Sequence, residues 1–148
     1  MRGAHPPSHS VAARLIDWSA AARIVQAAAA QAQHVGLKVN IAVVDPGGNL
    51  AAFLRMPGAP LHSIDIAIDK AYTAASFGLP TSQWSTALLN HSDAVQRGIV
   101  LRSRFIAFGG GLPIVEAGER IGGVGVSGGT EQEDEQCACA GLAALGLE

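Results

Sequence analysis

The sequence predicts a single α+β domain in which helices pack on a mostly antiparallel sheet. Near the start, in the middle and at the end of the chain, apolar residues recur at the spacing of an amphipathic helix. Between these segments lie short stretches rich in β-branched residues, and the turns that separate them are short enough for hairpins. Hairpins join antiparallel strands, and a chain of 148 residues suits one core. We therefore expect the order helix, two strands, helix, short helical connection, three strands, helix.

The first part of the domain is expected to be a helix followed by a β-hairpin. The helix begins at Ser19, a capping residue, and runs to about His34, with Gly36 as its stop. Residues 38–45 form a strand, and residues 49–55 return beside it. The Asp-Pro-Gly-Gly-Asn sequence between the strands is typical of a turn, because Pro presets one backbone angle and Gly permits left-handed ones.

The second part is expected to supply two more long helices and the rest of the sheet. A helix covers residues 61–77, and a short helix covers residues 81–89. Three strand-like pieces separated by Gly-rich turns follow: 104–108, 112–118 and 120–127. The last helix covers residues 131–145. Residues 1–15 are expected to form a flexible N-terminal segment before a single domain of residues 16–148.

Composition and charge limit the classes of partner. The net charge is −2 and 15% of residues are charged, so the chain lacks the basic field that nucleic-acid binding needs. No apolar run approaches the roughly 18 residues of a membrane span, and the first residues contain no apolar export signal. We therefore expect a cytoplasmic protein with neither nucleic acid nor membrane as partner. Cys137 and Cys139 fit no redox or disulfide pattern, which favours free thiols.

The sequence "SGGTEQEDEQ" combines a glycine pair with a cluster of acids at the start of the last helix. Thr130 and Glu133 have the spacing of a capping box, in which each side chain bonds the other's backbone N–H. Glu131 and Asp134 add negative charge where the helix dipole is positive, so a phosphate would meet like charge. Both acids could also share a divalent metal, but acids in a first helical turn are common, and we favour the capping interpretation.

Two glycine-rich segments predict places where another group packs closely against the backbone. "GGGLPI" needs backbone freedom that glycine supplies, and "GGVGVSGG" leaves one face of a strand without side chains. Such a face accepts a flat ligand, a second subunit or a closely packed helix. The sequence alone leaves these three alternatives open, and close helix packing is the most ordinary of them.

A polar set remains after the core positions of the second helix are assigned. Its members lie at the end of a strand and along one helix: Arg55, His62, Asp65, Asp69, Lys70 and Thr73. His62 and Asp65 lie three residues apart, so the carboxylate could orient the imidazole. Lys70 has apolar neighbours, so its amine is expected either to reach a carboxylate such as Asp134 or to face a pocket.

Four motifs occur in an order that resembles the GlcG/HbpS-like, or haem-degrading domain, family: "VVDPGGNLAAFLRMPGA", "DKAYTAASFGLPT", "GGGLPI" and "IGGVGVSGGTEQEDE". The resemblance covers roughly residues 16–145 and extends to the C-terminal domain of some cobalamin adenosyltransferases. It implies a profilin-like three-layer fold, with a five-stranded antiparallel sheet and helices on both faces. It also implies homo-oligomers from dimers to octamers, haem binding in several members, and genes placed with those for small organic acid or aromatic catabolism.

The motifs carry the resemblance to particular positions of this chain. The candidate ligand-binding residues that it implies are Arg55, Thr73, Gly110, Gly111, Pro113, Ser127 and Gly128. Lys70 and Asp134 match the same motifs and are candidate catalytic residues. Glu131 stands where relatives usually have proline, which adds negative charge at this helix start.

Three functions are compatible with these residues. In the first, the protein binds haem or another tetrapyrrole, His62 ligates the iron, and Arg55 or Lys70 pairs with propionates. His62 is our own choice of metal ligand, because the family does not mark this position. In the second, an isomerase, tautomerase or hydrolase holds a small organic acid with Arg55 and Lys70, while His62 or Asp134 transfers protons. In the third, the protein is an accessory oligomer without chemistry of its own.

Overall fold

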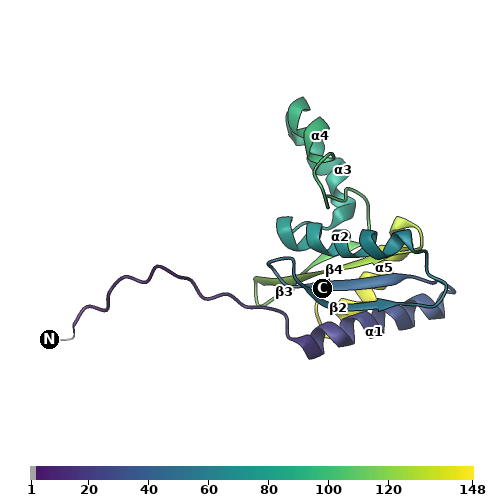
Figure 1. The fold of residues 1–148 in the computed structure, drawn as a ribbon, viewed down its shortest axis with the longest axis horizontal. Coiled ribbons are helices and arrows are strands. Elements are labelled where there is room, and N and C mark those ends of the chain that lie inside the picture. Colours follow the sequence, from purple (N-terminus) through teal and green to yellow (C-terminus); the bar gives the residue numbers. More distant parts are fainter. Residues whose placement is uncertain (1–2) are drawn as a thin grey trace.

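A computed structural model describes residues 3–148 as three layers, with a sheet between helices (Figure 1). The sheet has four antiparallel strands in the order β2-β1-β4-β3. Helix α2 covers one face, and helices α1 and α5 pack together on the other. The bounds are α1 Trp18–His34, β1 Asn40–Val44, β2 Leu50–Arg55, α2 His62–Phe77, α3 Trp84–Ala87, α4 Asp93–Ile99, β3 Gly111–Glu116, β4 Glu119–Ser127 and α5 Glu131–Ala143, with 3₁₀ turns at Thr81–Gln83 and Leu88–Asn90.

The prediction of a fifth strand was wrong: residues 104–108 form no strand, and the sheet of residues 3–148 has four. The backbone of this segment bonds to a side chain instead of a neighbouring strand. The hydroxyl of Thr73 donates to the carbonyl of Arg104 and accepts from the N–H of Ile106, at 2.9 and 3.1 Å. Arg104 also has a φ of 68°, a left-handed conformation that interrupts an extended chain. The α+β class and the helices on both faces are confirmed, whereas the profilin-like designation stays a prediction.

The first helix and the hairpin follow local signals in the sequence. Asp17, rather than the expected Ser19, caps α1, because its carboxylate accepts the backbone N–H of Ser19 at 3.0 Å. The turn between β1 and β2 is confirmed. The carboxylate of Asp45 accepts the backbone N–H groups of Gly47 and Asn49, at 2.9 and 3.0 Å, which fixes the hairpin that carries Arg55 at its far end.

The side-chain-free face of β4 lies directly under α2. A Cβ atom added to Gly125 would be 2.1 Å from the carbonyl oxygen of Ala67, and one added to Gly123 would be 2.4 Å from that of Ala71. Both distances are shorter than any van der Waals contact, so the backbone of α2 occupies the place of these side chains. Of the three alternatives for this face, the structure shows close packing of a helix.

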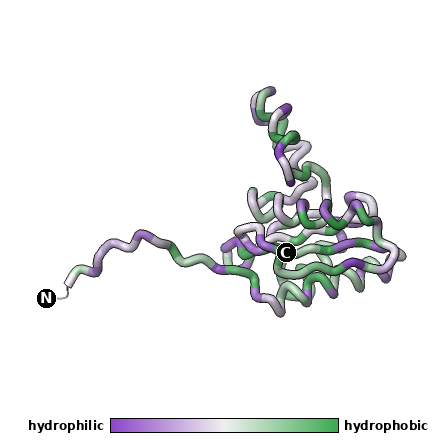
Figure 2. Tube along the Cα trace, in the orientation of Figure 1, coloured by the Kyte–Doolittle hydropathy of each residue, from purple (hydrophilic) through white to green (hydrophobic). Residues whose placement is uncertain are grey.

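Two segments project from the layered body. Residues 3–15 have no helix or strand and lie exposed, and residues 81–105 carry α3 and α4 away from the sheet (Figure 1). Hydrophobic stretches run into this second projection, which we call the arm (Figure 2). Leu89 and Leu101 are 74% and 82% exposed there. These apolar residues lie on short segments, and no helix of residues 3–148 is both long and apolar enough to cross a membrane.

We expect Gly125→Ala to destabilise the fold by about 1–3 kcal/mol or more, because the new methyl group must displace the backbone of α2. Gly98→Ala is the matched control. Gly98 lies in α4 with nothing within 4 Å of an added Cβ, so alanine there is expected to be neutral or to stabilise by up to about 1 kcal/mol. Urea unfolding measures both variants. Equal stability of the Gly125 variant and the parent would contradict the close packing of α2 on β4.

Candidate functional site

The candidate site is centred on a buried ion pair between Lys70 of α2 and Asp134 of α5. The ammonium nitrogen donates to the carboxylate Oδ2 of Asp134 at 3.0 Å and to the backbone carbonyl of Val126 in β4 at 2.8 Å. The two side chains are only 1% and 2% exposed. The ring of Phe108 lies 5.2 Å from the same nitrogen, in the range of a cation–π contact. The amine therefore reaches a carboxylate, the first of the two alternatives that the sequence left open.

The acids at the start of α5 bond to the protein's own backbone. Thr130 and Glu133 form the predicted capping box, with bonds of 3.0 and 3.2 Å. Asp134 accepts the N–H of Gly129 through Oδ1 at 2.8 Å, and Glu131 accepts the N–H of Gly109 at 2.7 Å. The residues that the structure describes contain no group of three potential metal ligands. The capping interpretation of this segment is confirmed.

The glycines before β3 pack against the ion pair. A Cβ atom added to Gly110 would lie 2.6 Å from the ammonium nitrogen of Lys70, and one added to Gly111 would lie 2.5 Å from the Lys70 carbonyl oxygen. The hydroxyl of Thr81 accepts the N–H of Gly111 at 2.9 Å. Lys70 and Asp134 thus meet as predicted, and Gly110 and Gly111 pack against them in an interior that leaves no room for a ligand.

Burial lowers the pKa of Lys70 below its ordinary value of 10.5, and the charge of Asp134 opposes that shift. The unfolded chain therefore binds this proton more tightly than the folded one. The contribution of Lys70 to stability rises with pH in the window between its folded pKa and 10.5. Both carboxylate oxygens of Asp134 and the amine are engaged, so proton transfer to a ligand would require the pair to open.

The two thiols differ in environment. Cys137 is buried, and burial together with nearby Asp134 and Glu133 raises its pKa to about 11. Its thiol is therefore protonated near neutral pH and is a poor nucleophile. Cys139 is exposed, and its pKa is also raised, mainly by desolvation. Both are free thiols, as predicted.

Arg55 lies away from the ion pair, at a cavity between α1 and β2. The cavity has a volume of about 600 Å³, and its lining residues are Gln26, Ala29, Ala30, Gln33, Gly36, Leu37, Lys38, Leu54, Arg55, Met56 and Pro57. The guanidinium of Arg55 donates to the carbonyl of Ala59 at 2.7 Å. Lys38 lies over Gly58, whose added Cβ would meet its aliphatic carbons at 2.9 Å. Neither cation has a carboxylate within ion-pair distance in residues 3–148.

His62 is exposed at the first residue of α2 and does not line this cavity. It is nevertheless only three residues beyond Ala59, the residue that Arg55 contacts. The imidazole thus lies at the exposed start of α2, and Arg55 is hydrogen-bonded to the loop that precedes this helix.

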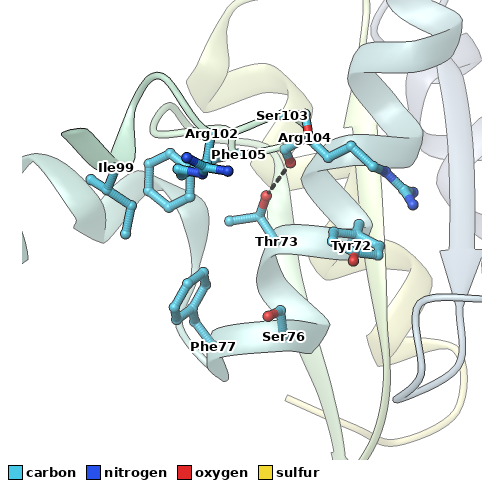
Figure 3. A pocket seen from close by; sticks show the side chains of 9 residues that line it. All are labelled: Tyr72, Thr73, Ser76, Phe77, Ile99, Arg102, Ser103, Arg104 and Phe105. Carbon is cyan, nitrogen blue, oxygen red and sulfur yellow. Dashed lines mark hydrogen bonds between the residues drawn. The ribbon is translucent and has the colours of Figure 1, made fainter.

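None of the remaining predicted residues lines the cavity that Arg55 borders. Thr73 borders a second cavity, of about 210 Å³, beside the arm (Figure 3). Pro113 is half-buried in the edge strand β3, where its missing N–H costs no sheet hydrogen bond. Ser127 is buried opposite Asn40 at the end of β4, and Gly128 is exposed just after it.

Arg55 lines the first cavity and Thr73 the second, but the sequence analysis did not identify the other residues that line either one. Lys38 was predicted only as the start of a strand, and Met56 was given no role. Tyr72, Thr73, Ser76 and Phe77 border the second cavity at positions i, i+1, i+4 and i+5 of α2, a spacing that places them on one side of a helix. This pattern was present in the sequence, but the segment that closes the cavity, residues 102–105, overlaps the one predicted to be a strand.

Comparison with known proteins identifies the class of protein to which this fold belongs. The family model described as "Haem degrading protein HbpS-like" matches residues 16–143. The chain belongs to this HbpS-like family, which confirms the resemblance found in the sequence motifs.

Two similar proteins come from bacteria. The chain is 37% identical over 123 residues to an uncharacterized 15.0 kDa protein in the dhaT-dhaS intergenic region of Citrobacter freundii, covering 83% of this chain and 87% of that protein. It is 33% identical over 132 residues to the corrinoid adenosyltransferase PduO of Salmonella typhimurium, covering 84% of this chain but only 37% of PduO.

One similar solved structure contains haem. The crystal structure of a PduOC–haem complex matches with a TM-score of 0.82 and 29% identity, covering 90% of this chain and 97% of that chain. Haem is therefore bound by a protein of the same fold.

We expect Lys70→Met to destabilise the protein by about 3–5 kcal/mol, because it leaves the Asp134 carboxylate buried without its cation. The double variant Lys70→Met/Asp134→Asn should recover part of this loss, since the buried charge is then removed as well. Lys38→Met is the matched control at the other lysine of the sequence, which is exposed. Chemical unfolding gives the free energies. A Lys70 variant within about 0.5 kcal/mol of the parent would show that the pair is not structural.

Proposed function

We propose that this protein binds haem or a related tetrapyrrole as a small-ligand-binding member of the HbpS-like family. The single observation that carries the proposal is the haem complex of the related PduOC structure. The cavity beside β2 supports it further. Its volume of about 600 Å³ lies in the roughly 300–1,000 Å³ range of small-molecule sites, and most of its lining is apolar.

The charges at this cavity suit the propionates of a tetrapyrrole. Lys38 and Arg55 both border it and have no acidic partner within residues 3–148. Cations pair favourably with carboxylates, and the guanidinium of Arg55 can donate two parallel hydrogen bonds. Arg55 thus keeps its predicted role, while Lys38 takes the place of Lys70, whose amine is held by Asp134.

His62 stays the proposed iron ligand, because histidine is a common axial ligand of haem iron. Since His62 is exposed at the start of α2 and does not line the cavity, it would reach the iron only of a haem that projects from the cavity toward α2. Met56 borders the cavity and offers a thioether as a second ligand of a type found in cytochromes. Bound haem would supply iron chemistry, whereas the residues of this chain would bind the propionates and orient the ring.

The alternative of an enzyme acting on a small organic acid needs a different arrangement. Lys70 or Asp134 would have to leave the other to hold a substrate or move a proton, because both are sealed from solvent. An accessory role in organic acid or aromatic catabolism agrees with the binding proposal, since a binding protein needs no such rearrangement.

We further propose that the protein is a homo-oligomer in which the arm contacts a second copy. The arm projects from the body and exposes Leu89, Val100 and Leu101 (Figure 1). Apolar residues gathered on a projecting segment favour burial against a partner. A second copy is the simplest partner, because symmetric homo-oligomers are the commonest assemblies of soluble proteins.

Titration with hemin tests the binding proposal. We expect a saturable Soret band, a changed Soret position in His62→Ala, and an affinity weakened by about tenfold or more in Lys38→Gln/Arg55→Gln. His91→Ala is the matched control, because His91 is an exposed histidine of the arm. A Soret band that is the same in the parent and His62→Ala would remove His62 as ligand. The absence of a saturable band would refute haem binding.

Light scattering after size exclusion tests the oligomer. We expect the parent to have a mass of at least two chains of 15.1 kDa, and Leu89→Asp/Leu101→Asp to shift toward one chain, because each charge would be buried at the contact. Val11→Asp is the control, since Val11 is 91% exposed in the N-terminal segment, outside the proposed contact. A parent that elutes with the mass of one chain would disprove the assembly.

A further inference from the structure

The cavity beside the arm is a second, separate hollow with a mainly apolar wall. Its volume is about 210 Å³, and it lies in the angle between α2 and the chain that returns from α4 (Figure 3). Its lining contains three aromatic residues and two arginines: Tyr72, Phe77, Phe105, Arg102 and Arg104. No aspartate or glutamate lines it. The cavity therefore combines aromatic surface with positive charge.

The walls of this cavity are held in place by contacts within the protein. The hydroxyl of Thr73 bonds to the backbone on both sides of Phe105, which fixes the backbone position of that residue. The rings of Phe77, Trp84 and Phe105 pack edge to face, with centroids 4.9 to 6.0 Å apart. Edge-to-face packing is the preferred arrangement of aromatic rings, so the pair that lines the cavity is preorganised.

The two arginines differ in what they bind. Arg104 is already engaged: its guanidinium pairs with Asp69 at 3.0 Å and stacks on the ring of Tyr72 at 3.7 Å. Arg102 has no carboxylate within ion-pair distance in residues 3–148, although it lines the same hollow. An unpaired guanidinium at the edge of an aromatic cavity favours a ligand that brings its own carboxylate.

We propose that this cavity binds a single-ring aromatic carboxylate, with its ring against Phe77 and Phe105 and its carboxylate on Arg102. The volume is smaller than the roughly 300–1,000 Å³ of sites for drug-sized molecules, which limits the ligand to about one ring. The lack of acidic lining residues excludes a cationic ligand as the preferred class. The hydroxyl of Ser76 also faces the hollow and can bond to a ring substituent (Figure 3).

This site is distinct from the one proposed for haem. None of its lining residues lines the cavity between α1 and β2. The two proposals can therefore fail independently: hemin binding depends on Lys38, Arg55 and His62, whereas binding of an aromatic acid depends on Arg102 and on the open space beside Ser76.

Tryptophan fluorescence offers a direct test. The chain has two tryptophans, Trp84 in contact with both cavity rings and Trp18, which is 77% exposed on α1. In a Trp18→Phe background, benzoate is expected to change the emission of Trp84 saturably, with a Kd on the order of 1 mM or below. Benzyl alcohol, which lacks the carboxylate, and butanoate, which lacks the ring, should each bind at least about tenfold more weakly.

Two variants locate the binding. Arg102→Gln should weaken benzoate binding by about tenfold, whereas Arg97→Gln, on an exposed arginine of the same arm, should leave it unchanged. Ser76→Phe should abolish binding, because Ser76 is exposed and a ring placed there would fill the hollow without disturbing the core.

Saturation-transfer NMR of benzoate, and circular dichroism of each variant, keep the test decisive. The NMR signal reports binding even where the emission of Trp84 does not change, and the dichroism shows that a variant has folded. The proposal is overturned if benzoate gives neither signal, if benzyl alcohol binds as well as benzoate, or if a folded Arg102→Gln variant binds with the parent's affinity.

Discussion

The buried pair of Lys70 and Asp134 is the interaction on which the rest of the structure depends. It joins three layers at one point: Lys70 belongs to α2, its second acceptor to β4 and its carboxylate partner to α5. A buried ion pair stabilises only when its remaining hydrogen-bonding capacity is satisfied, and here the carbonyl of Val126 and the N–H of Gly129 satisfy it. Positions 110 and 111 must be glycine for the pair to form, because any side chain there would collide with Lys70.

The same constraint explains why the candidate ligand sites lie at the periphery. The glycines of β4 let α2 approach so closely that the bare face of the strand is covered by backbone. A flat ligand cannot enter there, and the amine that could have met it is neutralised by a carboxylate. Space remains where α1 meets the end of β2 and where the arm leaves α2. In both places an arginine borders a hollow without an acidic partner, so binding chemistry is concentrated where the core packing ends.

Sequence reasoning succeeded where local chemistry decides the structure. The capping box of Thr130 and Glu133, the turn at Asp45 and the helix of α2 each depend on residues a few positions apart. It failed at residues 104–108, whose run of apolar residues resembles a strand but whose backbone bonds to Thr73, 31 and 33 positions earlier in the chain. Arg102 could not be recognised as a candidate for the same reason. Whether an arginine is paired depends on which distant carboxylates the fold brings to it, and Asp69 comes to Arg104 instead.

The placement of the acids reconciles a negative net charge with sites for anionic ligands. The chain carries a net charge of −2, yet many of its carboxylates bond to its own backbone or side chains, as Asp17, Asp45, Asp69, Glu131, Glu133 and Asp134 do. Their charge is thereby fixed at helix starts, in turns and in ion pairs, and none of these acids lines either cavity. Exposed charges are screened beyond about 8 Å at physiological salt, so an anion in a hollow responds mainly to the cations beside it. Lys38, Arg55 and Arg102 therefore determine the local field, and the net charge of the chain does not.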